Sequence, residues 1–257
     1  MPGVQNHNGY MVDGRERATA VQPRVRHLVL HYTAGDFESS FATLSRGKVS
    51  SHYLLPQALT AGHPIVFQLV PEDQTAHHAG ISFWQGRTNI NDTSVGIEIV
   101  NRGAQGAGDA VPWQAFTPFQ IMLLKELGRD IVERYGIAPH RVVGHSDIAP
   151  DRKDDPGPLF PWKALAEAGI GAWPDSDTVA YHLAQREPGE LVADIGSLQT
   201  RLRRYGYDAP VTGRQDLKTT EILMAFQMHF RPSDYRGIAD AETDAILDAL
   251  LEKYQMP

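Results

Sequence analysis

The sequence of 257 residues contains no cysteine. Disulfide frameworks, cysteine nucleophiles and zinc sites with thiolate ligands are therefore excluded, and a metal could be held only by histidine and carboxylate side chains. Long apolar runs are also missing, because no window approaches the roughly 18 to 20 apolar residues that a membrane helix needs. Residues 1–23 are polar and lack the apolar core of a Sec signal peptide. We therefore expect no membrane insertion and no classical export signal in this chain.

Positive charge is scarce as well. The chain has 24 Lys and Arg against 31 Asp and Glu, a formal net charge of -7, and no cluster of basic residues. Because a polyanion needs a basic surface, we expect no nucleic acid partner. The remaining composition, 42% hydrophobic and 21% charged, is that of a globular protein long enough for one large domain or two unequal ones.

Histidine is unevenly distributed along the chain. Nine of the 11 histidines lie between His7 and His145. A metal or acid–base site is therefore expected in the first two thirds of the chain. The segment 169–177 is rich in Gly, Pro and Asp and reads as a turn or linker. We predict a catalytic domain at residues 1–178 and a helical domain at 179–257.

The pattern of the first part predicts strands that alternate with helices. Helix 118–135 has the clearest ends, with Thr117 as N-cap and Gly136 as its stop. Glu98 faces away from both Ile97 and Ile99 in its strand. The strands are expected at 25–32, 51–55, 64–70, 93–100 and 141–144, and further helices at 37–46 and 162–168. This order predicts an α/β fold with a mixed central sheet flanked by helices.

Polar residues that could bind a metal follow two of these strands. His31 and His145 each end an apolar strand, and Asp155 comes ten residues after His145. Three alternatives stay open at this point. A single histidine at a strand end is more often a buried residue that binds no metal. Glu98 could be an exposed strand residue. Lys153 belongs to a run of charged residues, and such runs are ordinarily solvated. Asp147 and Asp154 are rivals of Asp155 as ligand.

Five segments occur together in a recognisable order, at 30–34 (LHYTA), 51–55 (SHYLL), 78–84, 91–98 and 144–158. Through them, residues 20–168 resemble the zinc-dependent N-acetylmuramoyl-L-alanine amidases of the type 2 family, whose fold is shared with the peptidoglycan recognition proteins. The resemblance implies that His31, His145 and Asp155 bind one zinc ion per chain and that Glu98 and Lys153 are catalytic. It favours Asp155 because this residue precedes Pro156-Gly-Pro158, as in the family.

The implied reaction is hydrolysis of the amide bond between N-acetylmuramic acid and the L-Ala of the stem peptide. Three protein ligands leave a fourth zinc position for water, whose pKa falls towards about 7. Glu98 would be the general base for this zinc-bound water. Lys153 would stabilise the oxyanion, an effect worth roughly 3 to 4 kcal/mol in comparable sites.

Five residues are predicted to contact the substrate. Arg87 could pair with a stem-peptide carboxylate in bidentate geometry, whereas Trp84 could equally belong to the core. His77 stands where relatives often have Trp. Residues 101–108, with three glycines, are expected to form a flexible loop beside Glu98. The five predicted contacts are His78, His52, Trp84, Arg87 and Asn91.

The C-terminal part is predicted to contain three helices, at 195–205, 217–230 and 241–254. Residues 197–207 together with 219–230 resemble the small three-helix peptidoglycan-binding domain. Residues 211–216 differ from the Asp-Gly turn that relatives usually have there. Polymer binding and a merely stabilising or oligomerising role both stay open for this part.

Two other functions compete with the amidase prediction. A non-catalytic peptidoglycan recognition protein could dispense with a zinc ligand, whereas this chain has the full set. A zinc peptidase for other amides lacks support because no His-Glu-x-x-His motif is present. Peptidoglycan or muropeptides are the expected partners. The cell envelope or periplasm is the favoured location, reached by non-classical export or after removal of a signal, with the cytoplasm as alternative.

Overall fold

A five-stranded mixed sheet lies at the centre of the computed structural model, which describes residues 4–7, 9–16, 18–21, 23–104, 112–187 and 189–256. The strand order is β5-β4-β8-β3-β9, with β5 antiparallel to β4 and all other pairs parallel. The carboxyl ends of β4, β8, β3 and β9 therefore meet at one edge. The strands are β3 (His27–Tyr32), β4 (Tyr53–Leu55), β5 (Phe67–Gln68), β8 (Ser94–Ile99) and β9 (Val142–Gly144).

This sheet confirms the predicted α/β class, although several strands are shorter than expected. The strand predicted at 64–70 contains only Phe67–Gln68, because Pro64 and Pro71 flank it and it pairs on one side only. Short elements complete the first part of the chain. They are β6 (Phe83–Trp84), β7 (Arg87–Thr88), η1 (Ile90–Thr93), η2 (Pro139–Arg141), α3 (His145–Ile148) and α4 (Trp162–Ala166).

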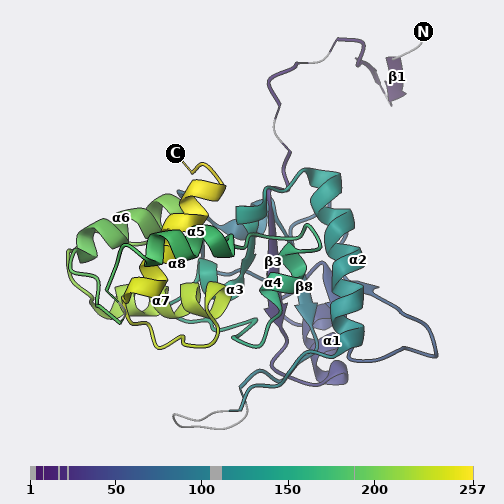
Figure 1. The fold of residues 1–257 in the computed structure, drawn as a ribbon. Helices are drawn as coiled ribbons and strands as arrows, with labels where there is room; N and C mark the ends of the chain where they lie inside the picture. Colours follow the sequence, from purple (N-terminus) through teal and green to yellow (C-terminus); the bar gives the residue numbers. More distant parts are fainter. Residues whose placement is uncertain are drawn as a thin grey trace.

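Helix α2 (Pro118–Tyr135) covers one face of the sheet, and its ends are those predicted from the sequence. Thr117 and Gln120 form a capping box at its start, and Gly136 ends it with φ 61°. Leu28 and Leu30 of β3 pack in the same hydrophobic cluster as the buried side of α2. Figure 1 shows α2 on one side of β3 and the C-terminal helices on the other.

Helix α1 (Phe37–Arg46) follows β3 through a short loop and so starts at the carboxyl edge of the sheet. Asp36 caps it, as predicted, by accepting a hydrogen bond from the Ser39 amide. Leu44 packs against Leu54 and Val100. This contact places the helix beside the carboxyl ends of β4 and β8.

Four helices form the C-terminal part, which we call the C-terminal helices: α5 (Ser176–Leu183), α6 (Ile195–Tyr205), α7 (Leu217–Phe230) and α8 (Ala241–Lys253). The last three confirm the predicted helices. The prediction missed α5, because the turn-rich composition of 169–177 suggested a linker. This short amphipathic helix packs through Val179 on the hydrophobic core that contains α8, and such packing stabilises a helix of eight residues.

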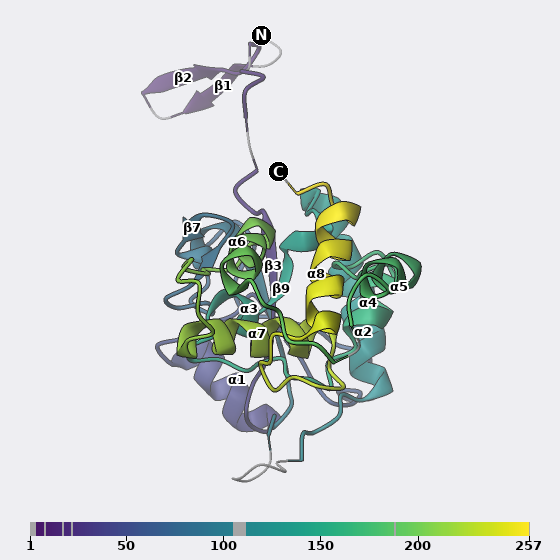
Figure 2. The ribbon, with the colours of Figure 1, turned by 60° about the vertical axis from the view of Figure 1, so that its left-hand side comes forward.

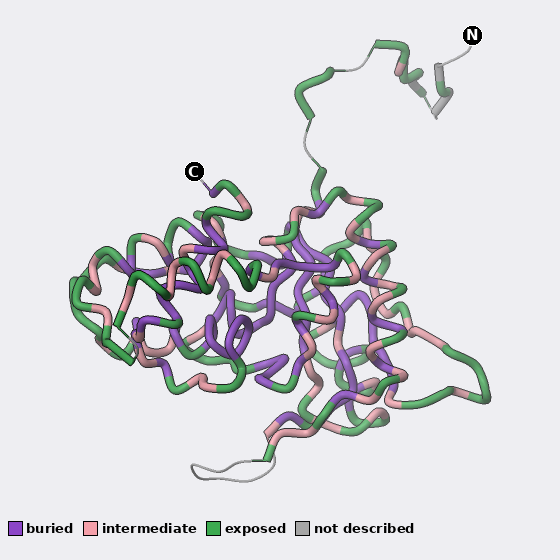
Figure 3. The backbone as a smooth tube through the Cα atoms, in the orientation of Figure 1, coloured by how far each residue is buried: buried purple, intermediate pink, exposed green. Residues whose placement is uncertain are grey.

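The C-terminal helices share a hydrophobic core with the second face of the sheet. Val29 and Val143 from the sheet belong to one buried cluster with Leu202, Phe226 and Leu247 from the helices. Figure 3 shows buried residues gathered in the middle of the body, where the sheet and the C-terminal helices meet. The helices are therefore packed on the sheet and are not merely tethered to it.

An antiparallel hairpin, β1 (Val4–His7) and β2 (Tyr10–Asp13), precedes this body and was not predicted. It stands apart from the rest of the chain in Figures 1 and 2. Of the expected flexible loop at 101–108, residues 105–108 lie outside the described residues. Among the described helices, none has the length and apolar character required to span a membrane.

Candidate metal centre and substrate cleft

Three buried side chains converge at the carboxyl edge of the sheet. His31 comes from the end of β3, His145 begins α3 directly after β9, and Asp155 lies in the following loop. The Nδ1 atoms of His31 and His145 are 3.0 Å apart, and Asp155 Oδ2 lies 2.9 Å and 3.1 Å from them. The parallel pairing of β3 with β9 brings the two histidines together. These three residues form a group that could hold a metal ion.

The Nε2 atoms of both histidines have hydrogen-bond partners, which leaves their Nδ1 atoms available as metal ligands. His145 Nε2 lies 3.0 Å from the carbonyl oxygen of Ala79, so this nitrogen donates and Nδ1 is unprotonated in the neutral ring. His31 Nε2 lies 3.0 Å from His78 Nδ1. His78 Nε2 in turn donates to Ser94 Oγ, which donates to the Ile90 carbonyl oxygen. Because His78 Nε2 donates, His78 Nδ1 accepts the proton of His31 Nε2. The Nδ1 lone pairs of His31 and His145 therefore both point to the centre of the three residues.

The charges at this centre fit a group that could hold a metal ion. Burial, followed by the neighbouring His145, lowers the pKa of His31 to about 4, so its imidazole is neutral at pH 7. Burial alone would raise the pKa of Asp155, but His145 and His31 outweigh it and hold that pKa well below the usual range. The centre therefore offers a neutral His31 imidazole and the Asp155 carboxylate, with the Nδ1 atom of His145 beside them.

The two rivals of Asp155 are occupied elsewhere. Asp147 is buried and accepts hydrogen bonds from the amide of Gly144 and from the Tyr207 hydroxyl. Asp154 accepts a hydrogen bond from the Tyr32 hydroxyl. Only Asp155 of the three lies with the two histidines, as the sequence comparison with the family favoured.

Glu98 lies beside these three residues, in register with His31 on the neighbouring strand β8. Its Oε2 is buried and has no hydrogen-bond partner within the described part of the chain. Burial is the main cause that raises the pKa of Glu98 well above its usual value; the Asp155 charge adds to the rise and the Lys153 charge opposes it. A partly buried carboxyl group with a raised pKa next to a possible metal site is suited to proton transfer.

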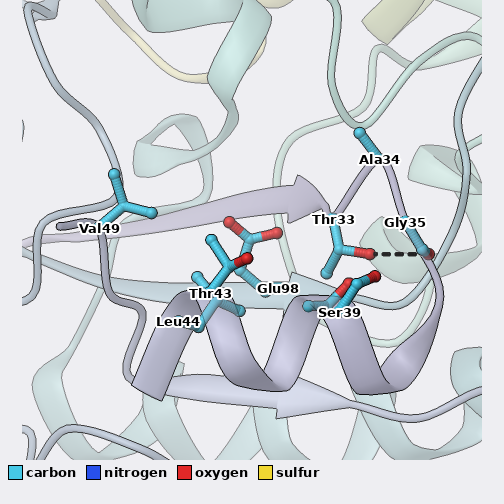
Figure 4. Close-up of a pocket in the computed structure, with 9 residues that line it drawn as sticks. Thr33, Ala34, Gly35, Ser39, Thr43, Leu44, Val49 and Glu98 are labelled. Carbon is cyan, nitrogen blue, oxygen red and sulfur yellow. Dashed lines mark hydrogen bonds between the residues drawn. The ribbon is translucent and has the colours of Figure 1, made fainter. Parts of the chain in front are cut away.

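Two adjoining cavities form a cleft around these residues. The first, of about 340 Å³, contains the three ligand candidates together with Glu98 and Lys153. The second, of about 300 Å³, lies between Glu98 and helix α1 (Figure 4). Glu98 borders both cavities, so one carboxylate can reach a substrate that spans them. The second cavity is lined with hydroxyl groups, from Thr33, Ser39, Ser40 and Thr43.

Three predicted substrate contacts have structural partners instead. His78 borders the cleft but both its ring nitrogens are used, by His31 and by Ser94. His52 is fully buried, and its ring accepts the Gly96 amide proton and donates to the Gln74 carbonyl oxygen. Asn91 Oδ1 accepts the amide protons of His78 and Ala79. These contacts occupy both ring nitrogens of His78 and of His52 and the side-chain oxygen of Asn91, so these atoms support the site from within the protein.

The other two predicted contacts lie away from the cleft. Trp84 is 1% exposed and packs against Tyr205 and Tyr207, which confirms the core alternative. Arg87 is exposed on β7. Arg87 is not among the residues that line either cavity of the cleft.

The sequence prediction missed several residues that do border the cleft. Arg152 lines it and donates hydrogen bonds to the carbonyl oxygens of Ala79 and Ile81. Its position directly before Lys153 was the available signal. His77 also lines the cavity, at the position where the family resemblance already indicated a difference. Nothing in the sequence indicated that the hydroxyl groups of α1 line a cavity, because serine and threonine on a helix are ordinarily solvated.

The site combines two imidazoles, one carboxylate and a neighbouring, partly buried glutamate at the open edge of an α/β sheet. These are the side chains that a metal-dependent hydrolase uses. Residues 21–158 match the family model of N-acetylmuramoyl-L-alanine amidase, and residues 192–247 match that of a putative peptidoglycan binding domain. The chain is 53% identical to N-acetylmuramoyl-L-alanine amidase AmiD of Escherichia coli (strain K12) over 256 residues, covering 98% of this chain and 91% of that protein. The 1,6-anhydro-N-acetylmuramyl-L-alanine amidase AmpD of the same organism is 37% identical over 122 residues, covering 48% and 59%.

Solved structures agree with this. A complex of AmiD from E. coli with anhydro-N-acetylmuramic acid-L-Ala-D-gamma-Glu-L-Lys superposes with a TM-score of 0.92 at 52% identity, covering 99% of both chains. AMPDH3 from Pseudomonas aeruginosa superposes with a TM-score of 0.84 at 43% identity, covering 98% of both. The chain belongs to the N-acetylmuramoyl-L-alanine amidase family. It is an amide hydrolase that cleaves the bond between N-acetylmuramic acid and the L-Ala of the stem peptide.

Proposed function

We propose that this amidase is a zinc enzyme in which His31, His145 and Asp155 hold one zinc ion per chain. Tetrahedral zinc ligands at about 2.0 to 2.2 Å from the ion lie roughly 3.3 Å from one another. The three donor atoms here are separated by 2.9 to 3.1 Å. Two nitrogens and one oxygen are also the ligand types of catalytic zinc sites, which keep a position open for water.

Bound zinc would supply a Lewis acid and a water acidified to a pKa of about 7. Glu98 takes the proton from the attacking water and passes it to the leaving amine, which its raised pKa favours. Lys153 borders the same cavity and carries the positive charge that stabilises the oxyanion formed at the scissile carbonyl. Arg152 holds the rim of the cleft through the carbonyl oxygens of Ala79 and Ile81.

The substrate is proposed to lie across both cavities, with the scissile amide at Glu98. The hydroxyl groups along α1 would bind a polar part of the muropeptide in the second cavity (Figure 4). AmiD has been solved with an anhydro-muramyl tripeptide and AMPDH3 with anhydromuramic pentapeptide. We therefore propose anhydro-muropeptides among the substrates of this chain.

The C-terminal helices are proposed to bind peptidoglycan. We place the division between the two domains just before α5, because the boundary predicted from the sequence at residues 178 and 179 would cut through this helix. The match of residues 192–247 to a putative peptidoglycan binding domain supports this role. The cell envelope is the proposed place of action, because polymeric peptidoglycan lies there.

The decisive experiment compares intact sacculi with a soluble anhydro-muropeptide as substrates of the zinc-loaded protein. Mass spectrometry should detect free stem peptides with L-Ala amino termini from both, and a zinc chelator should abolish their release. A protein that is equally active after complete metal removal would contradict the zinc proposal. Activity on the soluble substrate alone would contradict the proposed action on the polymer.

A further inference from the structure

Asp147 is a buried carboxylate two residues after His145 that the proposed chemistry does not use. It is 1% exposed, and three donors surround it. Its Oδ2 accepts the Gly144 amide proton at 2.7 Å and faces His229 Nδ1 at 2.8 Å. Its Oδ1 accepts the Tyr207 hydroxyl proton at 2.6 Å. Two of these three donors come from the C-terminal helices and the segment that follows α6.

Packing fixes both of these donors in position. The His229 ring stacks on Trp162 at 3.7 Å and on Phe230 at 3.9 Å between ring centroids. The Tyr207 ring is fully buried and lies 4.9 Å from that of Trp84. Side chains held in this way present their donors with little loss of rotamer entropy when the hydrogen bonds form.

Asp147 transmits this anchoring to the metal ligands through the backbone. Its bond to the Gly144 amide closes the first turn of α3, whose first residue is His145. The amide of Ser146, in the same turn, donates to the Asp155 carbonyl oxygen at 2.9 Å. The orientation of α3 thus fixes both His145 and Asp155.

A second attachment reaches the far end of the ligand loop. Trp113 Nε1 donates to the Tyr235 hydroxyl at 3.0 Å, and Tyr235 lies between α7 and α8. The Trp113 ring packs on Gly157, where a Cβ atom would lie only 2.7 Å away. The loop that carries His145 and Asp155 is therefore held from the C-terminal helices at both ends.

We propose that Tyr207 and His229 are positioning residues of the metal centre, which hold His145 and Asp155 in their ligating arrangement through Asp147. The C-terminal helices are then part of the catalytic apparatus and do more than bind polymer. The inference rests on the proposed ligand set. Removing one donor leaves the buried Asp147 carboxylate short of a hydrogen bond and frees α3 to shift.

The test uses the full chain with Tyr207→Phe and His229→Phe, which remove one donor each and keep an aromatic ring. His229→Asn should restore a donor close to the position of Nδ1. Tyr205→Phe is the matched control, because Tyr205 is a buried tyrosine of the same core, stacked on Tyr207. Zinc affinity is measured by competition with a chromophoric chelator, and ligand geometry by the absorption spectrum of the cobalt-substituted protein.

We expect Tyr207→Phe and His229→Phe to bind zinc about tenfold more weakly, the lower end of losses seen for outer-shell partners of metal ligands. The cobalt spectrum should change and kcat on a soluble muropeptide should fall, with KM nearly constant. His229→Asn should recover zinc affinity. Tyr205→Phe should lower the melting temperature at most.

Wild-type zinc affinity and cobalt spectrum in both phenylalanine variants would overturn the positioning role, whatever happens to the melting temperature. Should His229→Phe fail to fold, Tyr207→Phe carries the test, since it removes a single oxygen atom. Failure of the ligand assignment looks different: a His145→Ala protein would then bind zinc as tightly as the wild type.

Discussion

The Nδ1 atoms of His31 and His145 lie 3.0 Å apart although 114 positions separate the two residues in the sequence. The approach depends on β3 and β9 being adjacent and parallel, with Leu30 in register with Gly144. Two nitrogen lone pairs that face each other this closely, beside the Asp155 carboxylate, are favourable only around a cation or a shared proton.

Loss of Asp155 should remove the metal. Asp155→Ala eliminates the only anionic ligand of the proposed set, so zinc content measured by plasma mass spectrometry after desalting should drop from about one ion per chain to a small remainder. Asp151→Asn, an exposed position in the same loop, is the control and should keep its zinc. Equal zinc contents in the two variants would contradict the ligand set.

Glu98→Gln should separate catalysis from metal binding. The amide keeps the size of the side chain but cannot accept a proton from water, so kcat should fall by about 10² to 10⁴ while the zinc content stays at the wild-type level. Glu38→Gln, on the exposed first turn of α1, should behave as wild type. Loss of zinc from Glu98→Gln would mean that the carboxylate is a ligand.

Lys153→Met should reduce kcat/KM by about 10² to 10³, because the oxyanion then loses its positive partner. The loss should appear in kcat, since the charge develops only in the transition state. Lys163→Met, also exposed, provides the comparison outside the cleft. A pure increase in KM would assign Lys153 to ground-state substrate binding instead.

His27 should make the folded state sensitive to acid. Burial lowers the pKa of His27 to about 4 in the folded chain, against about 6.5 when unfolded. The unfolded chain therefore takes up the proton first, and the contribution of His27 to stability is complete above pH 6.5 and is lost as the pH falls towards 4. The full loss amounts to about 3 kcal/mol.

Urea unfolding at pH 7 and pH 5 measures this loss. His27→Asn should show a smaller decrease in the free energy of unfolding than the wild type between the two pH values. His63→Asn, at an exposed histidine, should keep the wild-type decrease. A steeper decrease in His27→Asn would give the linkage the opposite sign.

Gly206→Ala should loosen the contact between α6 and the hairpin of β6 and β7. A Cβ atom there would lie 2.7 Å from the Trp84 ring, and φ is 155°. The clash should cost about 1 to 3 kcal/mol of unfolding free energy. Gly213→Ala, with φ 70° but no atom within 4 Å of the added Cβ, controls for backbone strain alone. Equal losses would show that strain, not the ring, causes the effect.

The sequence was sufficient where local signals act alone. The ends of α2 follow from Thr117, Pro118 and Gly136, and three of the C-terminal helices follow from their apolar spacing and caps. The α/β class and the amidase activity were also predicted correctly. For the proposed ligands, the strand-end positions of His31 and His145 and the resemblance of the Asp155 loop supplied the prediction.

The substrate contacts could not be predicted in the same way. They depend on which side chains become buried or hydrogen-bonded within the fold, and this is set by tertiary packing. Trp84 is of a residue type that often lines substrate clefts, but here it is buried against Tyr205 and Tyr207. Asn91 and His78 are polar in the sequence, but the structure uses their polar atoms internally. Asn91 Oδ1 accepts the amide proton of His78, and the ring nitrogens of His78 bond to His31 and Ser94. Helix α5 was missed because its stability comes from the core it packs on, not from its own residues.

The core shared by the sheet and the C-terminal helices limits how this enzyme can be recombined. Replacing the C-terminal helices by those of another amidase would expose Val29, Val143 and Trp84 to solvent, unless the surface of the new helices matched these side chains. Chimeras should therefore tolerate a junction only when the strands that carry these residues, β3, β6 and β9, are transferred together with the helices that cover them.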